Sequence, residues 1–466
     1  MKNKKKTPLI LFAVIVLLVA LGFGGWQAYK LLFSNRDLEL LGYSPQSIKS
    51  INEKDLKDVF IEAGHSELMI YAFQNNENAI DEYEYYLIPD GSFSSELSTE
   101  YIYNNVRKLQ QKEYSANNVR NIIMSLPDSS LRYIVEKDKP ENIAVFIDAI
   151  KAGFSNDESY TLANGSDELW EKISQGTISI DTINQLLEKG YVIGDINSIL
   201  LGLGEEDVKM VLSMKHIPNL AKFLDSNLDF KLSLLPRYLI YIKYHDASIE
   251  EAMNTVNADK DVLAKNQIDF ASFYISDPFV ATNPNSYTVL VNKENRLPAD
   301  YEPADLVYLP DGYYGNNHPM RSVAANALIS LSDAAVKAGY QRIIGQSNYR
   351  SYGLQETLYN NYVRGYGQKE ADVFSARPGF SDHQTGLVSD IATATIDMES
   401  FDTYSGYKWV LDHAHEFGFI QRYPKNKEYI TGYEFESWHF RYVGVEAATM
   451  IHKFGWTLEE YKMLFD

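Results

Sequence analysis

The chain has 466 residues, of which 45% are hydrophobic, and a formal net charge of -20. Because a single hydrophobic core rarely serves more than about 250 to 300 residues, this length predicts more than one domain. The acidic balance excludes nucleic acid as a partner, since no basic surface is available to neutralise phosphates. Cysteine is absent, so any metal ion must be bound by histidines and carboxylates.

The N-terminus combines a cluster of lysines between residues 2 and 6 with an uncharged, largely apolar run over residues 7–29. About 20 such residues are enough for a helix to cross a bilayer, and the lysines favour a cytoplasmic start. We therefore interpret residues 1–34 as a transmembrane signal anchor, which predicts a single-pass protein of the cell membrane with the remainder outside. A cleaved signal peptide is the alternative. The length of the apolar run and the lack of a clear A-x-A site favour the uncleaved anchor.

Residues 35–258 are rich in polar side chains, poor in strand signals, and carry a weak internal repeat. A glycine or polar residue, an aromatic residue and a capping side chain recur between amphipathic segments, as at Leu41–Ser44 and Ala152–Ser155. This pattern is typical of short helices that end and restart at a turn, and several intervals lie near forty residues. We expect an all-α, repeat-like region that holds the following domain away from the membrane and offers a surface to an unidentified protein partner. The alternative is that such turns recur by chance.

Residues 259–466 differ in pattern and predict an α+β domain. Short apolar runs at 290–293 and 305–309 are interpreted as strands, the second closed by a Pro-Asp-Gly turn. Residues 321–338 have helical spacing, with Gly339 as a C-cap and an apolar face formed by Val323, Ala327, Leu331 and Ala334. A strand at 342–347 and a helix carrying Gln355, Leu358 and Tyr362 follow.

Two later segments each place a histidine beside a carboxylate in apolar surroundings, at 380–390 and at 436–439. Asp390 interrupts a run that predicts a buried strand, where an ionised carboxylate is costly unless a cation or hydrogen bonds compensate it. Three ligands (His383, Asp390 and His439) and one free carboxylate (Glu436) are the inventory of a hydrolytic zinc site. Taken singly, each residue is more typical of a hydrogen-bonded core histidine or a turn residue. The H-E-x-x-H motif of common metalloproteases is absent.

Three ordered motifs carry a resemblance to a known family: Ser347–Tyr352 with Gln355, Ser381–Leu387 with Asp390, and Glu436–His439. Together they resemble the successive signatures of the VanY-type zinc D-alanyl-D-alanine carboxypeptidases. The stretches at 418–424 and 431–433 also fit that family. The resemblance covers about residues 290–466 and leaves the helical region and the anchor unexplained.

The resemblance implies a role for each matching residue. It makes His383, Asp390 and His439 ligands of a Zn²⁺ ion, and Glu436 the general base. Arg350 would meet the oxyanion that develops on the scissile carbonyl, which suits a fixed guanidinium in a site partly closed to water. Arg350 and, as hydrogen-bonding candidates, Gln355 and Ser381 would bind the substrate, a peptidoglycan stem peptide that loses its terminal D-alanine.

Two departures from the family pattern concern the same site. Ser437 stands where the family usually has proline, between Glu436 and the tryptophan. In a regular strand Glu436 and His439 would point to opposite faces, so the chain must bend between them if both approach one metal. Val388 and Ser389 replace small apolar residues before the aspartate ligand. No ligand is lost, and we expect activity.

Other interpretations remain open. Similar motifs serve L,D-carboxypeptidases, which remove D-alanine from a tetrapeptide stem, and a non-catalytic cell-wall-binding protein could retain the fold. A second histidine pair, His413 and His415, lies in a predicted helix over 407–417. Residues two apart on a helix do not face each other, so we interpret this pair as surface residues or as support behind the site.

Overall fold

The structure is a computed structural model that describes residues 35–63, 66–76, 78–88, 97–165, 167–175 and 177–465. It forms two compact units, residues 1–183 and residues 184–466, with the boundary inside helix α12 (Ile180–Glu188). The predicted signal anchor, residues 1–34, lies outside the described residues. Within the described ranges, no helix combines the length and the apolar character that crossing a membrane requires.

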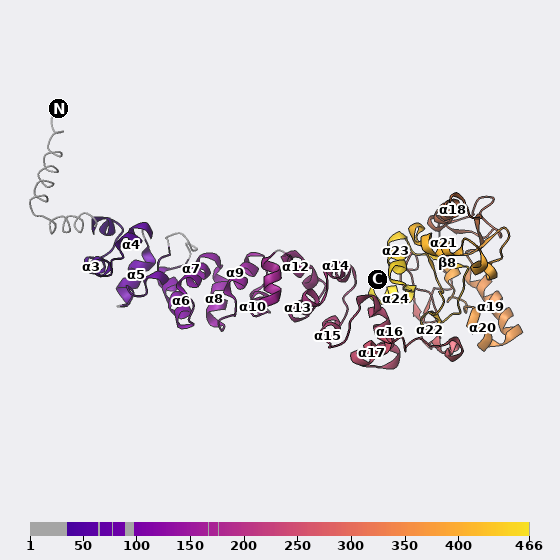
Figure 1. The fold of residues 1–466 in the computed structure, drawn as a ribbon, viewed down its shortest axis with the longest axis horizontal. Helices are drawn as coiled ribbons and strands as arrows, with labels where there is room; N and C mark the ends of the chain where they lie inside the picture. Colours follow the sequence, from indigo (N-terminus) through magenta and orange to yellow (C-terminus); the bar gives the residue numbers. More distant parts are fainter. Residues whose placement is uncertain are drawn as a thin grey trace, which may run out of the picture. The chain divides into compact units, whose positions relative to one another are not determined.

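The described residues of the first unit form helices and no strands, as the sequence predicts (Figure 1). Neighbouring helices pack on one another, for example α5 on α6 and α9 on α10. The helices are α3 (Pro45–Glu53), α4 (Lys57–Ala63), α5 (Glu67–Asn75), η1 (Tyr83–Tyr85), α6 (Thr99–Gln111), α7 (Ala116–Ser125), α8 (Asp128–Glu136), α9 (Ile143–Lys151), α10 (Asn156–Ala163) and α11 (Asp167–Ser174).

The turns between these helices follow the predicted pattern. After α9, Gly153 has a φ of +96°, a conformation that glycine adopts without steric cost. Phe154 is buried, and the Ser155 side chain accepts a hydrogen bond from the backbone N–H of Glu158 in a capping box that begins α10. The same order occurs at 42–44, so that one turn ends a helix, buries a ring and starts the next helix.

The second unit begins with short helices and continues into a mixed domain. Its first helices are α13 (Ile193–Gly202), α14 (Glu205–Ser213), α15 (Leu220–Leu224), η2 (Leu232–Leu234), α16 (Leu235–His245) and α17 (Ile249–Asn257). They contact the C-terminal helix α24 (Leu458–Leu464) and the residues before it: α16 packs on α24, the Trp456 indole N–H donates to Ser233 O at 2.7 Å, and Lys215 N–H donates to Leu464 O at 2.8 Å. These helices and the mixed domain therefore belong to one compact body.

A four-stranded antiparallel sheet forms the centre of the mixed domain, in the order β5-β6-β8-β7. The strands are β5 (Ile343–Ser347), β6 (Val388–Thr393), β7 (Phe419–Gln421) and β8 (His439–Tyr442). Every residue of β6 and β8 is buried. Two short pairs lie outside this sheet, β1 (Phe279–Val280) with β2 (Asn295–Arg296) and β3 (Leu306–Val307) with β4 (Met320–Arg321).

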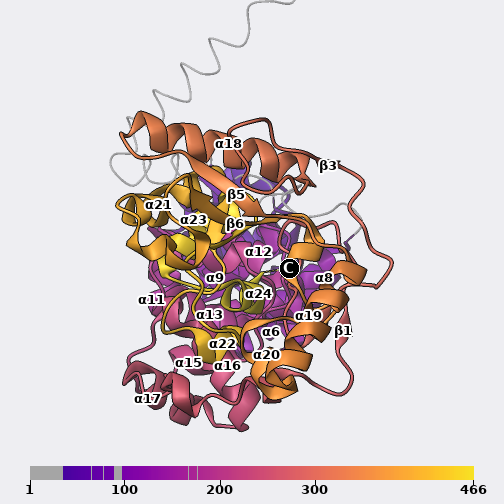
Figure 2. The ribbon, with the colours of Figure 1, turned by 90° about the vertical axis from the view of Figure 1, so that its right-hand side faces the viewer.

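Helices cover the sheet and complete the core. Helix α18 (Ser322–Lys337) packs on β5, and its leucines and alanines join Ile343, Ile391 and Phe440 in the main hydrophobic cluster (Figure 2). Helix α23 (Val445–Phe454) packs on β7. The remaining elements are η3 (Lys265–Gln267), η4 (Phe270–Phe273), α19 (Tyr352–Tyr366), α20 (Gln368–Phe374), η5 (Asp382–Thr385), η6 (Met398–Thr403), α21 (Tyr407–His413), η7 (Ala414–Phe417) and α22 (Glu428–Thr431).

Two details of the predicted secondary structure are wrong. Residues 290–293 form no strand, because the Asn292 side chain accepts hydrogen bonds from the backbone N–H groups of Glu294 and Asn295 and turns the chain. In α18 the predicted Leu331 is buried, but Val323, Ala327 and Ala334 are only partly buried and Ala324, Leu328 and Ala335 form the rest of the buried face. Adjacent small apolar residues in this helix make several stripes possible, and only packing on the sheet selects one.

Candidate metal centre

His383 lies in a tight turn that is hydrogen-bonded to the segment preceding helix α19. The turn, η5, ends at Gly386 with a φ of +68°, where an added Cβ would come within 3.0 Å of the Arg321 side chain. The His383 ring is buried, and its Nδ1 lies 2.6 Å from the backbone oxygen of Asn348. That contact assigns the proton to Nδ1 and leaves Nε2 free to face Asp390, whose Oδ2 is 3.3 Å away.

Asp390 and His439 come together through the sheet. They are directly paired residues of the antiparallel strands β6 and β8, so their side chains project from the same face. His439 Nδ1 lies 3.1 Å from Asp390 Oδ1. Among the described residues, His383, Asp390 and His439 form a buried group whose ligand atoms all lie within 4.8 Å of one another. The three predicted ligands are therefore brought to one point from two separate stretches of the chain.

The electrostatics of this group centre on a buried negative charge. Burial opposes ionisation of Asp390, but the neighbouring rings of His383 and His439 outweigh it and hold the Asp390 pKa well below its usual range. Burial and then the Arg350 guanidinium lower the pKa of His383 to about 4. Burial also disfavours charge on His439, but its hydrogen bonds with Asp390 and Glu436 prevail and raise its pKa to about 9. Asp390 is thus an ionised carboxylate inside the protein, with the two imidazole rings beside it.

These features fit a divalent transition-metal ion. Two imidazoles and one carboxylate are the donor set of open zinc sites, which leave a position for water. Asp390 Oδ1 is buried 3.1 Å from His439 Nδ1, and a metal ion bound by both atoms would replace the proton that they otherwise share. The chemistry of these donors agrees with a bound Zn²⁺.

Glu436 approaches the three ligands from the loop before β8. Strand β8 begins only at His439, and bends at Ser437 and Trp438 release the chain from strand geometry. Glu436 Oε2 consequently lies 3.2 Å from His439 Nδ1, which satisfies the geometric condition set by the sequence. Burial raises the pKa of Glu436 above its ordinary value, although the hydrogen bond with His439 opposes the shift. A carboxyl group with a raised pKa beside the ligands is suited to proton transfer.

Arg350 follows β5 and reaches across to the metal group. Its guanidinium donates to Asp390 Oδ2 at 2.8 Å and to Ser347 Oγ at 3.1 Å. Gln355 is buried; its Oε1 accepts from Arg350 at 3.4 Å, and its Nε2 donates to Ala376 O at 2.8 Å. Gln355 therefore contacts the Arg350 guanidinium directly and helps to orient it.

A cleft of about 310 Å³ opens over these side chains and includes Ser381. Its lining includes the apolar or aromatic residues Leu358, Tyr362, Phe374 and Trp438. The acidic residues Asp382, Glu399 and Glu434 also line the cleft, and Glu434 pairs with Lys265 at 2.6 Å. All seven predicted site residues line this one cleft: Arg350, Gln355, Ser381, His383, Asp390, Glu436 and His439.

Sequence reasoning missed residues that hold the predicted ones. Asn348 orients His383 through its backbone oxygen, and its side-chain oxygen accepts from Ser389 at 2.8 Å. Asp382 is buried beside Arg422 and Arg441. Burial opposes ionisation of Asp382, but the two guanidiniums hold its pKa below the usual value. The available signal was the presence of arginines in strand-like apolar runs, as at residue 441 within His-Phe-Arg-Tyr.

The second histidine pair lies away from this group. His413 Nδ1 is 3.0 Å from Glu416 Oε1, and the His415 ring stacks on that of His452 with centroids 4.0 Å apart. Stacked parallel rings direct their nitrogen lone pairs side by side and cannot both point at one ion. The structure brings neither residue to the His–Asp–His group.

The comparisons with known proteins agree with this geometry. The family model described as VanY, D-alanyl-D-alanine carboxypeptidase, matches residues 317–445. "Putative carboxypeptidase YodJ" of Bacillus subtilis is 45% identical over 187 residues, which are 38% of this chain and 68% of that protein. The bifunctional D-Ala-D-Ala dipeptidase and D-Ala-D-Ala carboxypeptidase VanXYC of Enterococcus gallinarum is 30% identical over 177 residues, 37% of this chain and 91% of that protein.

Solved structures with similar sequences include the LdcB LD-carboxypeptidase, with 42% identity, a TM-score of 0.39, and coverage of 41% of this chain and 92% of that one. VanYB in complex with D-alanine-D-alanine has 35% identity, a TM-score of 0.34, and coverage of 38% and 97%. These observations define a class of structure: an α+β domain with an antiparallel sheet and a buried histidine–aspartate–histidine group that could hold a metal ion. The family model and the two relatives show that the chain belongs to the VanY family of D-alanyl-D-alanine carboxypeptidases, as the sequence motifs predict.

Proposed function

We propose that this protein is a zinc-dependent D-alanyl-D-alanine carboxypeptidase that removes the terminal D-alanine from peptidoglycan stem peptides. The observation that supports it most directly is the meeting of His383, Asp390 and His439 within 4.8 Å, with Glu436 3.2 Å from His439 in the same cleft. Membership of the VanY family agrees with this chemistry. The reaction adds one water to the last peptide bond and releases D-alanine and a stem peptide shortened by one residue.

His383 Nε2, an oxygen of Asp390 and His439 Nδ1 would hold the zinc ion. Zinc, when bound, supplies a Lewis acid that activates water and polarises a carbonyl at neutral pH. Glu436 accepts the proton of the attacking water and later delivers it to the nitrogen of the departing D-alanine. The raised Glu436 pKa suits both transfers, because the carboxylate accepts the proton readily and still releases it.

Arg350 stabilises the negative charge that forms on the carbonyl oxygen as water adds. Its guanidinium is held by Ser347 and Gln355, so little reorganisation is needed during the reaction. Leu358, Tyr362, Phe374 and Trp438 give the cleft part of an apolar and aromatic lining. A bound substrate that displaces water from this lining would strengthen the electrostatic contribution of Arg350.

The test uses the purified full chain, analysed for metal and incubated separately with pentapeptide and tetrapeptide stems, with products identified by mass. We expect the pentapeptide to lose one alanine, the loss to stop with a chelator, and zinc to restore it. Loss from the tetrapeptide alone would move the assignment to an L,D-carboxypeptidase. Zinc binding without cleavage of either stem would contradict a peptidase function and favour a wall-binding protein.

The location of the enzyme is a second part of the proposal. The lysine cluster and the uncharged run over residues 7–29 support a membrane anchor with the catalytic domain outside the cell. The cleft would then face the cell wall. Fractionation of cells, followed by protease treatment of intact protoplasts, should find the protein in the membrane and degrade residues 35–466. Recovery in the soluble cytoplasmic fraction would contradict this part.

A further inference from the structure

Four buried charged side chains near the metal centre are connected to one another by ion pairs. Arg422 and Arg441 are fully buried, Asp382 is 1% exposed and Glu459 is 8% exposed. Two positive and two negative charges make the group formally neutral. None of the four residues is assigned a role by the proposed reaction.

The group is connected by short ion pairs. Asp382 Oδ2 accepts Arg422 Nε at 3.0 Å, and Asp382 Oδ1 accepts Arg441 Nη1 at 2.6 Å. Arg422 also binds Glu459 with both terminal nitrogens, at 2.8 and 2.6 Å. Paired contacts between a guanidinium and a carboxylate fix the relative orientation of both planes. The order Arg441–Asp382–Arg422–Glu459 is therefore a defined chain of contacts.

The remaining donors of both arginines bind backbone oxygens. Arg422 Nη2 donates to Val291 O at 3.3 Å, and Arg441 Nη2 donates to Val289 O at 2.9 Å. Arg441 Nε donates to Tyr442 O at 3.1 Å. Every nitrogen of the two guanidiniums thus has a hydrogen-bond partner, so that rearranging either side chain would break contacts that are now made.

The group touches both histidine-bearing segments close to the ligands. Asp382 directly precedes His383, and Arg441 follows His439 by two residues in β8, on the same face of the strand. The backbone N–H of Arg422 donates to His439 O at 3.0 Å. The contact between Asp382 and Arg441 therefore ties the turn η5 to strand β8 and limits the distance between the two histidines.

A contribution to folding stability does not explain why these four charges are buried. Removing charges from water costs several kcal/mol per ion, and buried ion pairs are often replaced by apolar residues without loss of stability. What ion pairs of this geometry provide, and apolar packing does not, is a fixed orientation. A fixed orientation can outweigh the free-energy cost of burying the charges where two metal ligands must be held within about half an ångström.

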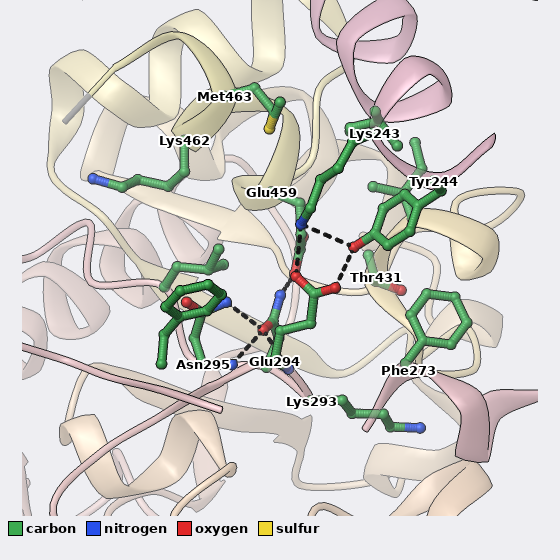
Figure 3. A pocket seen from close by; sticks show the side chains of 15 residues that line it. Lys243, Tyr244, Phe273, Lys293, Glu294, Asn295, Thr431, Glu459, Lys462 and Met463 are labelled. Atoms are coloured by element: carbon green, nitrogen blue, oxygen red, sulfur yellow. Dashed lines mark hydrogen bonds and ion pairs between the residues drawn. The ribbon is translucent and has the colours of Figure 1, made fainter. Parts of the chain in front are cut away.

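Glu459 is the outer end of the group and lies on α24. Its Oε1 also accepts Asn292 Nδ2 at 3.2 Å. It lines a cavity of about 180 Å³, shown in Figure 3, where Lys243, Tyr244 and Glu294 point toward one another. Figure 3 places Glu459 beside this second cluster, and Glu459 is not among the residues that line the substrate cleft. A helix that contributes no ligand and no cleft residue is in this way connected to the metal centre.

We infer that Asp382, Arg422, Arg441 and Glu459 are positioning residues that set the spacing of His383 and His439 for metal binding. The inference rests on the proposed zinc site. It extends the functional region to α24, which follows the last ligand in the sequence. Residues behind the ligands commonly change metal affinity by about 10- to 100-fold when they are replaced.

The experiment compares Glu459→Gln and Asp382→Asn in the full chain. Zinc affinity is measured by competition with a chromophoric chelator, and the geometry of the ligands by the absorption spectrum of the cobalt(II)-loaded protein. Glu460→Gln is the matched control, because the neighbouring Glu460 is also buried and pairs with Lys427 at 2.9 Å, outside the group. Thermal unfolding is followed for every variant.

We expect Asp382→Asn to weaken zinc binding by about 10- to 100-fold and Glu459→Gln by about tenfold, both with altered cobalt spectra. Glu460→Gln should lower thermal stability without changing either metal readout. Glu459→Gln keeps the size of the side chain at the edge of the group, so it carries the test if Asp382→Asn does not fold.

Wild-type zinc affinity and an unchanged cobalt spectrum in both variants would overturn the inference, even if thermal stability falls. The proposed function is judged separately, by hydrolysis of stem peptides. A wild-type protein that binds zinc without cleaving them would leave the positioning role intact and remove the peptidase assignment.

Discussion

Asp390 faces His439 across the antiparallel strands β6 and β8, with Asp390 Oδ1 3.1 Å from His439 Nδ1. A directly paired position in a sheet is among the most rigid relationships between two residues distant in sequence. The ladder therefore fixes two members of the metal group, and the turn η5 adds the third.

Asp390→Asn should abolish stoichiometric zinc binding. The change removes the negative charge and leaves Arg350 without the carboxylate that it contacts at 2.8 Å. The loss of affinity should exceed the roughly 10- to 100-fold effect of residues behind the ligands. Elemental analysis after gel filtration measures the bound zinc. Asp397→Asn, an exposed aspartate after β6, is the control and should retain the metal.

Glu436→Gln should keep zinc and lose hydrolysis. The amide retains the shape of the side chain but cannot accept a proton, and such groups contribute about 100- to 10,000-fold to rates. Initial rates on the pentapeptide stem, together with the zinc content of the same samples, measure the two effects. Glu446→Gln, on the exposed side of α23, should match the wild type. Wild-type turnover by a zinc-loaded Glu436→Gln protein would refute the role of this residue as base.

Ser389→Ala should destabilise the fold by about 1 to 3 kcal/mol. Ser389 is fully buried and donates to Asn348 Oδ1 at 2.8 Å, so its removal leaves a buried acceptor unsatisfied. Urea denaturation measures the free energy of unfolding. Ser330→Ala, on an exposed part of α18, should change it by less than about 0.5 kcal/mol. Equal stabilities of the two variants would show that the Asn348 contact contributes little.

Lys293 should make stability depend on pH in the alkaline range. Its side chain is buried, with the ammonium bonded to Phe270 O and Asp372 O and lying 4.4 Å from the centre of the Tyr433 ring. Burial lowers the Lys293 pKa from 10.5 to about 7. Between these values the unfolded chain binds more protons than the folded chain, so the contribution of Lys293 to stability rises with pH.

The free energy of unfolding of the wild type, relative to Lys293→Met, should therefore increase from about pH 7 to about pH 10. Urea denaturation of both proteins across this range provides the measurement. Lys369→Met, an exposed lysine on α20, is the control and should show a constant difference from the wild type. A constant difference for Lys293→Met as well would mean that Lys293 keeps an ordinary affinity for its proton.

The sequence predicted the residues whose chemistry is visible locally. Asp390 and His439 are recognisable as polar residues in apolar runs. The turns at 42–44 and 153–155 each contain a glycine, an aromatic residue and a serine, and this order predicts the helix that follows. The predicted strand at 290–293 failed because the Asn292 side chain competes for backbone N–H groups, a choice that hydrophobicity does not reveal.

The positioning group was not predictable for a different reason. Asp382 is separated from its partners by about 40 to 60 residues, and nothing near it in the sequence indicates a cationic neighbour. Arg422 and Arg441 stand in apolar, strand-like runs, but only the strand order shows that both meet the carboxylate of Asp382. Gln355 lines the cleft and stays a predicted substrate-binding residue, but its contact with Arg350 depends on the packing of α19 and is not visible in the sequence.

The strand order also determines how the site responds to local unfolding. β5 and β7 are the outer strands, whereas Asp390 and His439 lie on the inner strands β6 and β8. Outer strands open first in native-state hydrogen exchange, and inner strands exchange mainly through cooperative opening of the sheet. The amide hydrogens of Ile391 and Tyr442, bonded to Trp438 O and Leu387 O, should therefore exchange among the slowest in the protein. Asp390 and His439 would then keep their relative geometry until the inner strands separate, so that a loss of metal through local opening would begin at the turn that carries His383.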